Sequence, residues 1–134
     1  MSRQSLLLLL FMFVGCAGTG SDHEETGELE ARSRVGQAKE DIAAIEFALN
    51  NYAIENTGRW PESLQELVAP DENGFTFLKG PSVPLDPWEN DYGYEPPVPG
   101  QSMPRIICYG ADGKPGGEGK NRDFDNNMIR NGDI

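Results

Sequence analysis

The sequence predicts an α+β fold in which a long N-terminal α-helix packs on a small β-sheet. Residues 28–56 place apolar side chains at helical spacing, whereas residues 57–134 contain most of the 16 glycines and ten prolines. Glycine and proline interrupt regular structure and favour short strands and loops. A chain of 134 residues is long enough for one small domain and too short for two of ordinary size.

Residues 1–15 have the composition of a secretory signal peptide. An arginine precedes nine apolar residues at positions 6–14, and this run is much shorter than the roughly 20 residues that span a bilayer as a helix. The end of the segment, Phe-Val-Gly followed by Cys16, resembles a bacterial lipobox. In a lipobox the cysteine becomes the lipidated first residue of the mature protein. We therefore predict lipidation of Cys16, the alternative being an ordinary signal peptide cleaved near Gly18.

A lipid on Cys16 implies that the chain is held at a membrane surface in a bacterial cell envelope. Ala17 stands where an aspartate resembles an inner-membrane retention signal, so we expect the outer membrane, with the domain facing the periplasm. Residues 16–30 are acidic and poor in large apolar side chains. This composition predicts a flexible linker, which leaves residues 31–134 for the folded domain.

The formal net charge of −11 makes nucleic acid an unsuitable partner, because binding phosphate groups requires a basic surface. The single histidine, His23, lies in the predicted linker, and we expect it to be solvated. Cys108 lies in a predicted strand with no histidine partner, which favours a buried thiol. We therefore assign no catalytic residues and expect no enzymatic activity.

The long helix is predicted from one stripe of apolar side chains at intervals of three and four residues. The stripe consists of Val35, Ala38, Ile42, Ile45, Leu49 and Tyr52. Gly58 suits the left-handed conformation that ends a helix. Phe47 and Ile54 lie nearly opposite the stripe. We expect core packing on both faces, with an interface to a partner as the alternative.

The remaining sequence predicts one short helix and two short strands. Pro61 at a first helical position precedes Leu64 and Leu67, which indicates a short helix. Residues 92–95 and 105–109 flank a proline-rich turn and are expected to be paired strands. Because two strands of this length are not stable alone, we expect them to pack on the long helix.

A glycine-rich acidic loop follows within residues 106–127. Five glycines between positions 110 and 119 tolerate the positive φ of a tight fold-back, which lets Asp112, Asp123 and Asp125 converge. Converging carboxylates repel one another unless a cation lies between them, and carboxylate and carbonyl oxygens suit Ca²⁺. We predict a calcium loop, the alternative being a solvated acidic loop. An EF-hand is excluded, because Met128 stands where that motif requires glycine.

Three motifs, taken in order, resemble the periplasmic domain of the major pseudopilin, the G subunit, of type II secretion systems. The resemblance covers about residues 32–127 of this chain. The motifs are residues 52–61, the segment Asp86-Pro-Trp-Glu-Asn90 with Tyr92 and Tyr94, and Gly110-Ala-Asp-Gly113 with Gly-Gly-Glu-Gly at 116–119 and Asp123.

The resemblance implies a pseudopilin-like fold, in which a long helix packs on a small antiparallel β-sheet and a calcium ion is bound in the glycine-rich C-terminal loop. It implies Asp112 and Asp123 as calcium ligands, with the backbone carbonyl of Tyr109 as a further ligand. Arg122 is a departure from the family pattern, and we expect Asp125 to restore the negative charge.

The N-terminus also departs from the family, whose prepilin peptidase site and long apolar helix are not found in the leader. We interpret the chain as a non-enzymatic, calcium-stabilised structural or interaction domain, anchored to a membrane by lipid. Its expected partners are the membrane surface and proteins of a secretion or pilus-like assembly. The alternative is a surface lipoprotein that binds a small ligand or cell-wall glycan through exposed Trp60 and Trp88.

Overall fold

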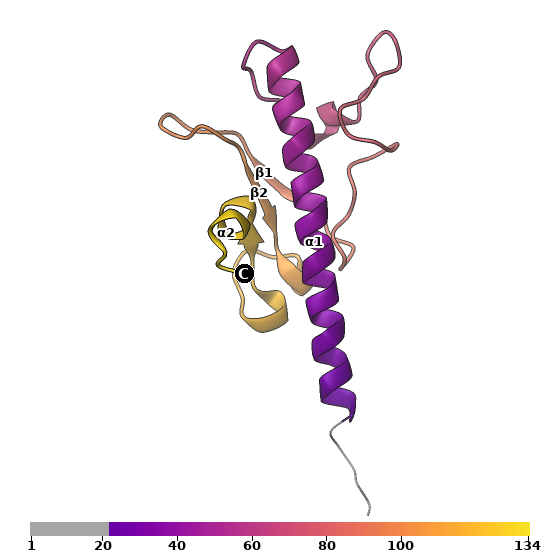
Figure 1. Ribbon diagram of the computed structural model, residues 1–134, viewed down its shortest axis with the longest axis vertical. Coiled ribbons are helices and arrows are strands. Elements are labelled where there is room, and N and C mark those ends of the chain that lie inside the picture. Colours follow the sequence, from indigo (N-terminus) through magenta and orange to yellow (C-terminus); the bar gives the residue numbers. More distant parts are fainter. Residues whose placement is uncertain (1–21) are drawn as a thin grey trace, which may run out of the picture.

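The computed structural model describes residues 22–134, and its longest element is helix α1 (Asp22–Glu55). The 34 residues of α1 correspond to a rod of about 51 Å, along one side of which the sheet lies (Figure 1). The predicted helix start at residue 28 was wrong, because residues 22–30 are helical where a flexible linker was expected. The four glutamates and the leucine in this segment are good helix formers, and they continue α1 beyond its packed part. Cys16 and the leader lie outside the described residues.

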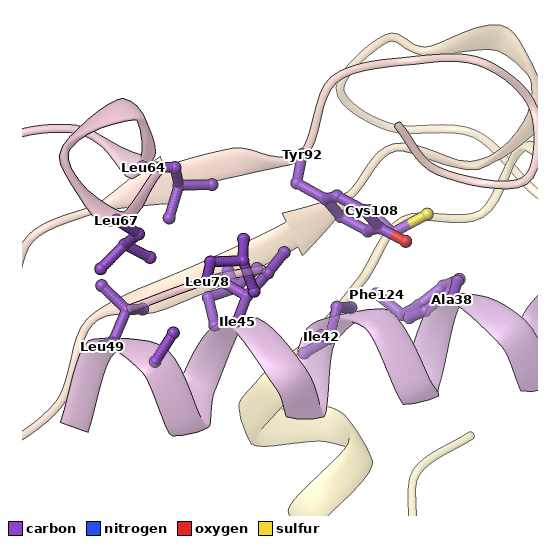
Figure 2. Close-up of a cluster of buried hydrophobic side chains, with 12 residues drawn as sticks. Ala38, Ile42, Ile45, Leu49, Leu64, Leu67, Leu78, Tyr92, Cys108 and Phe124 are labelled. Atoms are coloured by element: carbon purple, nitrogen blue, oxygen red, sulfur yellow. The ribbon is translucent and has the colours of Figure 1, made fainter. Parts of the chain in front are cut away.

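The predicted apolar stripe of α1 forms the centre of the core. Ala38, Ile42, Ile45 and Leu49 are at most 1% exposed, and Val35 and Tyr52 are partly buried at the two ends of the stripe. Figure 2 shows the four fully buried side chains of the stripe on the side of α1 that faces the short helix and the sheet. The stripe therefore determines which side of α1 receives the rest of the domain.

The opposite face of α1 differs from the prediction. Phe47 is 68% exposed and Ile54 is 73% exposed, so the expected second layer of core is wrong. The sheet and the short helix are packed on the other side of α1, and the domain is too small to cover both sides of the helix.

The sheet has three antiparallel strands in the order β1-β2-β3. Strand β1 (Gly93–Glu95) pairs with β2 (Arg105–Cys108), with Tyr94 opposite Ile106. Strand β3 (Phe124–Asp125) pairs with the other edge of β2. The two predicted strands and the antiparallel sheet on the helix are confirmed, whereas β3 was not predicted.

The connections end each element as their residues dictate. Gly58 has φ +83° and its N–H donates to the carbonyl oxygen of Ala53 at 2.7 Å, which confirms the glycine cap of α1. The predicted short helix is a 3₁₀ turn, Leu64–Leu67, whose two leucines are buried. Helix α2 (Asn126–Asn131), which was not predicted, ends at Gly132 with φ +79°.

Among residues 22–134, no helix combines the length and the apolar content needed to cross a bilayer.

Candidate metal centre

The glycine-rich loop folds back on itself, as its composition predicted. It contains two 3₁₀ turns, Gly110–Asp112 and Gly119–Asn121. A Cβ atom added to Gly110 would lie 2.7 Å from the carbonyl carbon of Asn121, and one added to Gly117 would lie 2.6 Å from the carbonyl oxygen of Asn121. Because real Cβ atoms do not approach backbone this closely, only glycine fits these two crossings.

Asp123 places one carboxylate oxygen in an unusual environment. Its Oδ2 accepts a hydrogen bond from the N–H of Gly116 at 2.8 Å. Its Oδ1 is buried and has no hydrogen-bond partner among residues 22–134. A buried, unpartnered carboxylate oxygen is costly, and a cation bound at Oδ1 would remove this cost. On this observation, Asp123 fits the role of a calcium ligand.

Asp112 and Tyr109 lie at the two ends of the first 3₁₀ turn. Tyr109 immediately precedes this turn, and Asp112 closes it as an exposed side chain. The Oδ1 atom of Asp112 accepts a hydrogen bond from the N–H of Lys114 at 3.2 Å. No three aspartate, glutamate, cysteine or histidine side chains within the described part of the chain are grouped to hold a metal. A calcium ion here would therefore need backbone carbonyls and water among its ligands.

Asp125 is buried and serves the fold instead. Its Oδ2 forms an ion pair with Nε of Arg105 at 2.6 Å, and its Oδ1 accepts a hydrogen bond from the N–H of Met128 at 2.9 Å, which caps α2. Burial acts to raise the pKa of Asp125, but the backbone N–H groups and the Arg105 guanidinium outweigh it and hold the pKa below its usual range. Because both oxygens have partners, we leave Asp125 out of the ligand set proposed below.

A turn over residues 86–90 is hydrogen-bonded to the glycine-rich loop and helps to hold it in place. This role was not predicted from the sequence. The Oδ1 atom of Asp86 accepts hydrogen bonds from the N–H groups of Trp88 and Asn90, each at 2.9 Å. The Nδ2 of Asn90 donates to the carbonyl oxygen of Gly110 at 3.2 Å. The signal available in the sequence was Asp86-Pro87, because an aspartate before proline favours a turn bonded to its own backbone.

Cys108 is fully buried, which confirms the expected buried thiol. Its Sγ donates to Oδ2 of Asp86 at 3.5 Å. Burial raises the pKa of the Cys108 thiol to about 12, and the nearby carboxylate of Asp86 acts in the same direction. The thiol therefore stays protonated at neutral pH and is a poor nucleophile.

Trp60 and Trp88 are both partly buried and pack against the core cluster. An aromatic platform for a sugar or small ligand needs an exposed ring face, which neither side chain offers in full. The arrangement therefore gives no support to the interpretation of the chain as a glycan-binding or ligand-binding lipoprotein.

Comparisons with known proteins agree with this architecture. The family described as "Type II secretion system (T2SS), protein G" matches residues 25–127. The type II secretion system core protein G of Vibrio cholerae is 34% identical over an alignment of 103 residues, and the match covers 70% of this chain and 68% of that protein. The core protein G of Pseudomonas aeruginosa is 35% identical over an alignment of 107 residues, and the match covers 71% of this chain and 72% of that protein.

A solved structure shows the same fold. The major pseudopilin from the type 2 secretion system of enterohaemorrhagic Escherichia coli superposes with a TM-score of 0.55 and 23% sequence identity. The superposition covers 80% of this chain and 95% of that chain. The shared fold thus includes the long helix and the three-stranded sheet on its side.

Proposed function

Because the chain belongs to the type II secretion system protein G family, we propose that it is a non-enzymatic structural or interaction domain of a type II secretion assembly. The observation that carries this proposal is the family match over residues 25–127. This range includes nearly all of α1, the whole sheet up to β3 and the glycine-rich loop. The matched range therefore contains the buried stripe of α1 and the whole sheet packed on it, whereas most of α2 lies beyond it.

A lipid anchor at Cys16 is the second part of the proposal. The leader of residues 1–15 and its lipobox-like end support it. The anchor would place the domain at the periplasmic face of a bacterial membrane. Residues 16–21 then separate the lipid from the start of α1, so the domain would work close to the membrane surface.

Deletion of the gene in the bacterium that encodes this chain is expected to reduce the amount of type II substrates in the culture medium. The wild-type gene should restore secretion. Cys16→Ser should fail to restore it, because the variant cannot be lipidated. Partition into the detergent phase on cloud-point extraction reports the anchor separately from secretion. Unchanged secretion in the deletion strain would contradict the secretion role, and unchanged partition of Cys16→Ser would contradict the anchor.

Calcium stabilisation is the third part. We propose that a calcium ion is bound by the Asp112 and Asp123 carboxylates and the backbone carbonyl of Tyr109, completed by other loop carbonyls and water. The unpartnered Oδ1 of Asp123 supports this set. When bound, the ion supplies positive charge to the loop, and the loop residues orient their oxygens towards it.

Calcium in excess is therefore expected to raise the free energy of unfolding of the full chain by about 2 kcal/mol at roughly 30 times the dissociation constant. Asp123→Asn should abolish this gain, because it removes the charge that attracts the ion. Thermal unfolding with calcium, and then with a chelator, measures the effect. Asp133→Asn is the matched control, an exposed carboxylate outside the loop. An equal calcium response in wild type and Asp123→Asn would refute the ligand assignment.

A further inference from the structure

A groove of about 550 Å³ lies between the N-terminal half of α1 and the segment that leads into β3. Its α1 wall runs from Glu28 to Lys39 with helical spacing, a length of about three turns. The second wall is formed by the end of the glycine-rich loop and by Trp88. Figure 1 shows that this loop lies beside the lower half of α1. The groove is thus elongated along the helix.

The charge of the groove is opposite to that of the chain. Four of its lining residues are basic and one is acidic, although the whole chain has 22 aspartates and glutamates against 11 lysines and arginines. Arg32 pairs with Glu28 at 2.6 Å, and Nζ of Lys39 donates to the backbone oxygen of Ile134, the last residue of the sequence, at 2.7 Å. Lys120 and Arg122 are exposed and form no ion pair within the described part of the chain.

The floor of the groove is apolar, and its α1 wall includes small residues. Trp88, Val35 and Phe124 line it from three different segments. Gly36 lies on the α1 wall, and a Cβ atom added there would meet no atom within 4 Å. Ala31, five residues before Gly36, also lines this wall, so two of the residues on it are small.

We propose that this groove binds an amphipathic helix of a partner protein, with an apolar stripe flanked by aspartates and glutamates. The apolar stripe would cover Trp88, Val35 and Phe124. The flanking carboxylates would meet the two unpaired cations, Lys120 and Arg122, on the second wall. A flat anionic lipid surface would contact the exposed cations but leave the floor of the groove uncovered. The observations therefore favour a helix, and binding is expected whether or not the chain works in secretion.

The test uses the full chain in a non-ionic detergent and a fluorescein-labelled 14-residue peptide of leucine, alanine and glutamate patterned as an amphipathic helix. Fluorescence anisotropy should show saturable binding that weakens with salt. The protein as a whole carries a formal charge of −11, so its overall field repels this peptide. Saturable binding of an acidic peptide therefore requires a local basic site.

Two variants test the location. Gly36→Phe adds a large side chain at the wall of the groove, where its Cβ atom would meet no atom within 4 Å. It should raise the dissociation constant at least tenfold. Gly27→Phe is the matched control, because Gly27 is also a helical glycine with no atom within 4 Å of an added Cβ but does not line the groove. The pair Lys120→Glu and Arg122→Glu should also raise the dissociation constant at least tenfold, whereas Lys114→Glu, outside the groove, should have little effect.

Circular dichroism of each variant checks that α1 is intact. Three results would overturn the proposal. Equal binding by Gly36→Phe and Gly27→Phe would place the peptide elsewhere. Displacement of the peptide by phosphatidylglycerol added to the micelles would show that the groove is a lipid site. Sedimentation showing that wild type, but not Gly36→Phe, dimerises would show that a second copy occupies the groove.

Discussion

Gly110→Ala is expected to lower the free energy of unfolding by about 3 kcal/mol. Gly110 has φ +66°, and an alanine in this conformation costs roughly 1–2 kcal/mol. The new Cβ would also lie 2.7 Å from the carbonyl carbon of Asn121. A backbone atom held in a 3₁₀ turn cannot move aside without shifting the turn, and such overpacking costs about 1–3 kcal/mol more.

Gly116→Ala separates these two effects. Gly116 also has positive φ, at +90°, but a Cβ atom added there would meet no atom within 4 Å. The free energy of unfolding of this control should therefore fall only by the conformational cost of roughly 1–2 kcal/mol. Urea unfolding of both variants gives the comparison. Equal losses would mean that the two 3₁₀ turns of the loop do not pack as closely as the structure shows.

The expected loss bears directly on the proposed calcium loop. Gly110 holds the chain segment that carries Tyr109 and Asp112 against the segment that carries Asp123. If this close crossing opens, the proposed ligands separate. Gly110→Ala should therefore weaken the calcium response as well.

The sequence was sufficient for the elements that rest on long or repeated patterns. The stripe from Val35 to Tyr52 repeats over five helical turns, so the buried side of α1 was predictable residue by residue. The strands around Tyr94 and Ile106 were predictable from a hairpin-like arrangement of apolar segments. These patterns depend on local spacing, which a single sequence contains in full.

The sequence was insufficient where tertiary contacts decide the structure. Strand β3 has two residues and α2 has six, too few for a periodic pattern. Asp125 looked like a third calcium ligand because it lies near Asp123 in sequence, but the pairing of β2 with β3 brings it to Arg105 and its cap position brings it to Met128. The exposure of Phe47 and Ile54 could not be predicted either, because it depends on how much of α1 the rest of the domain covers.

Asn126→Ala is expected to lower the free energy of unfolding by about 3 kcal/mol. Asn126 is 2% exposed, and its Oδ1 accepts the N–H of Ile106 while its Nδ2 donates to the carbonyl oxygen of Pro104, both at 3.1 Å. Strand β3 ends at Asp125, so its backbone pairing with β2 stops there. Beyond that point, the Asn126 side chain forms the hydrogen bonds to the backbone at the start of β2. Alanine leaves both backbone groups buried and unpaired, at a cost of about 1–3 kcal/mol for each.

The loss cannot come from α2 itself, because alanine is a better helix former than asparagine. Asn127→Ala is the matched control on the same helix. Asn127 is exposed and only accepts a hydrogen bond from Arg130 at 3.3 Å, so its loss should stay within about 0.5 kcal/mol. Urea unfolding measures the difference, and amide hydrogen exchange at Ile106 identifies its origin. If Ile106 keeps its protection in Asn126→Ala, the side-chain amide is not what completes the edge of β2, and the sheet must be held there by the packing of the buried core.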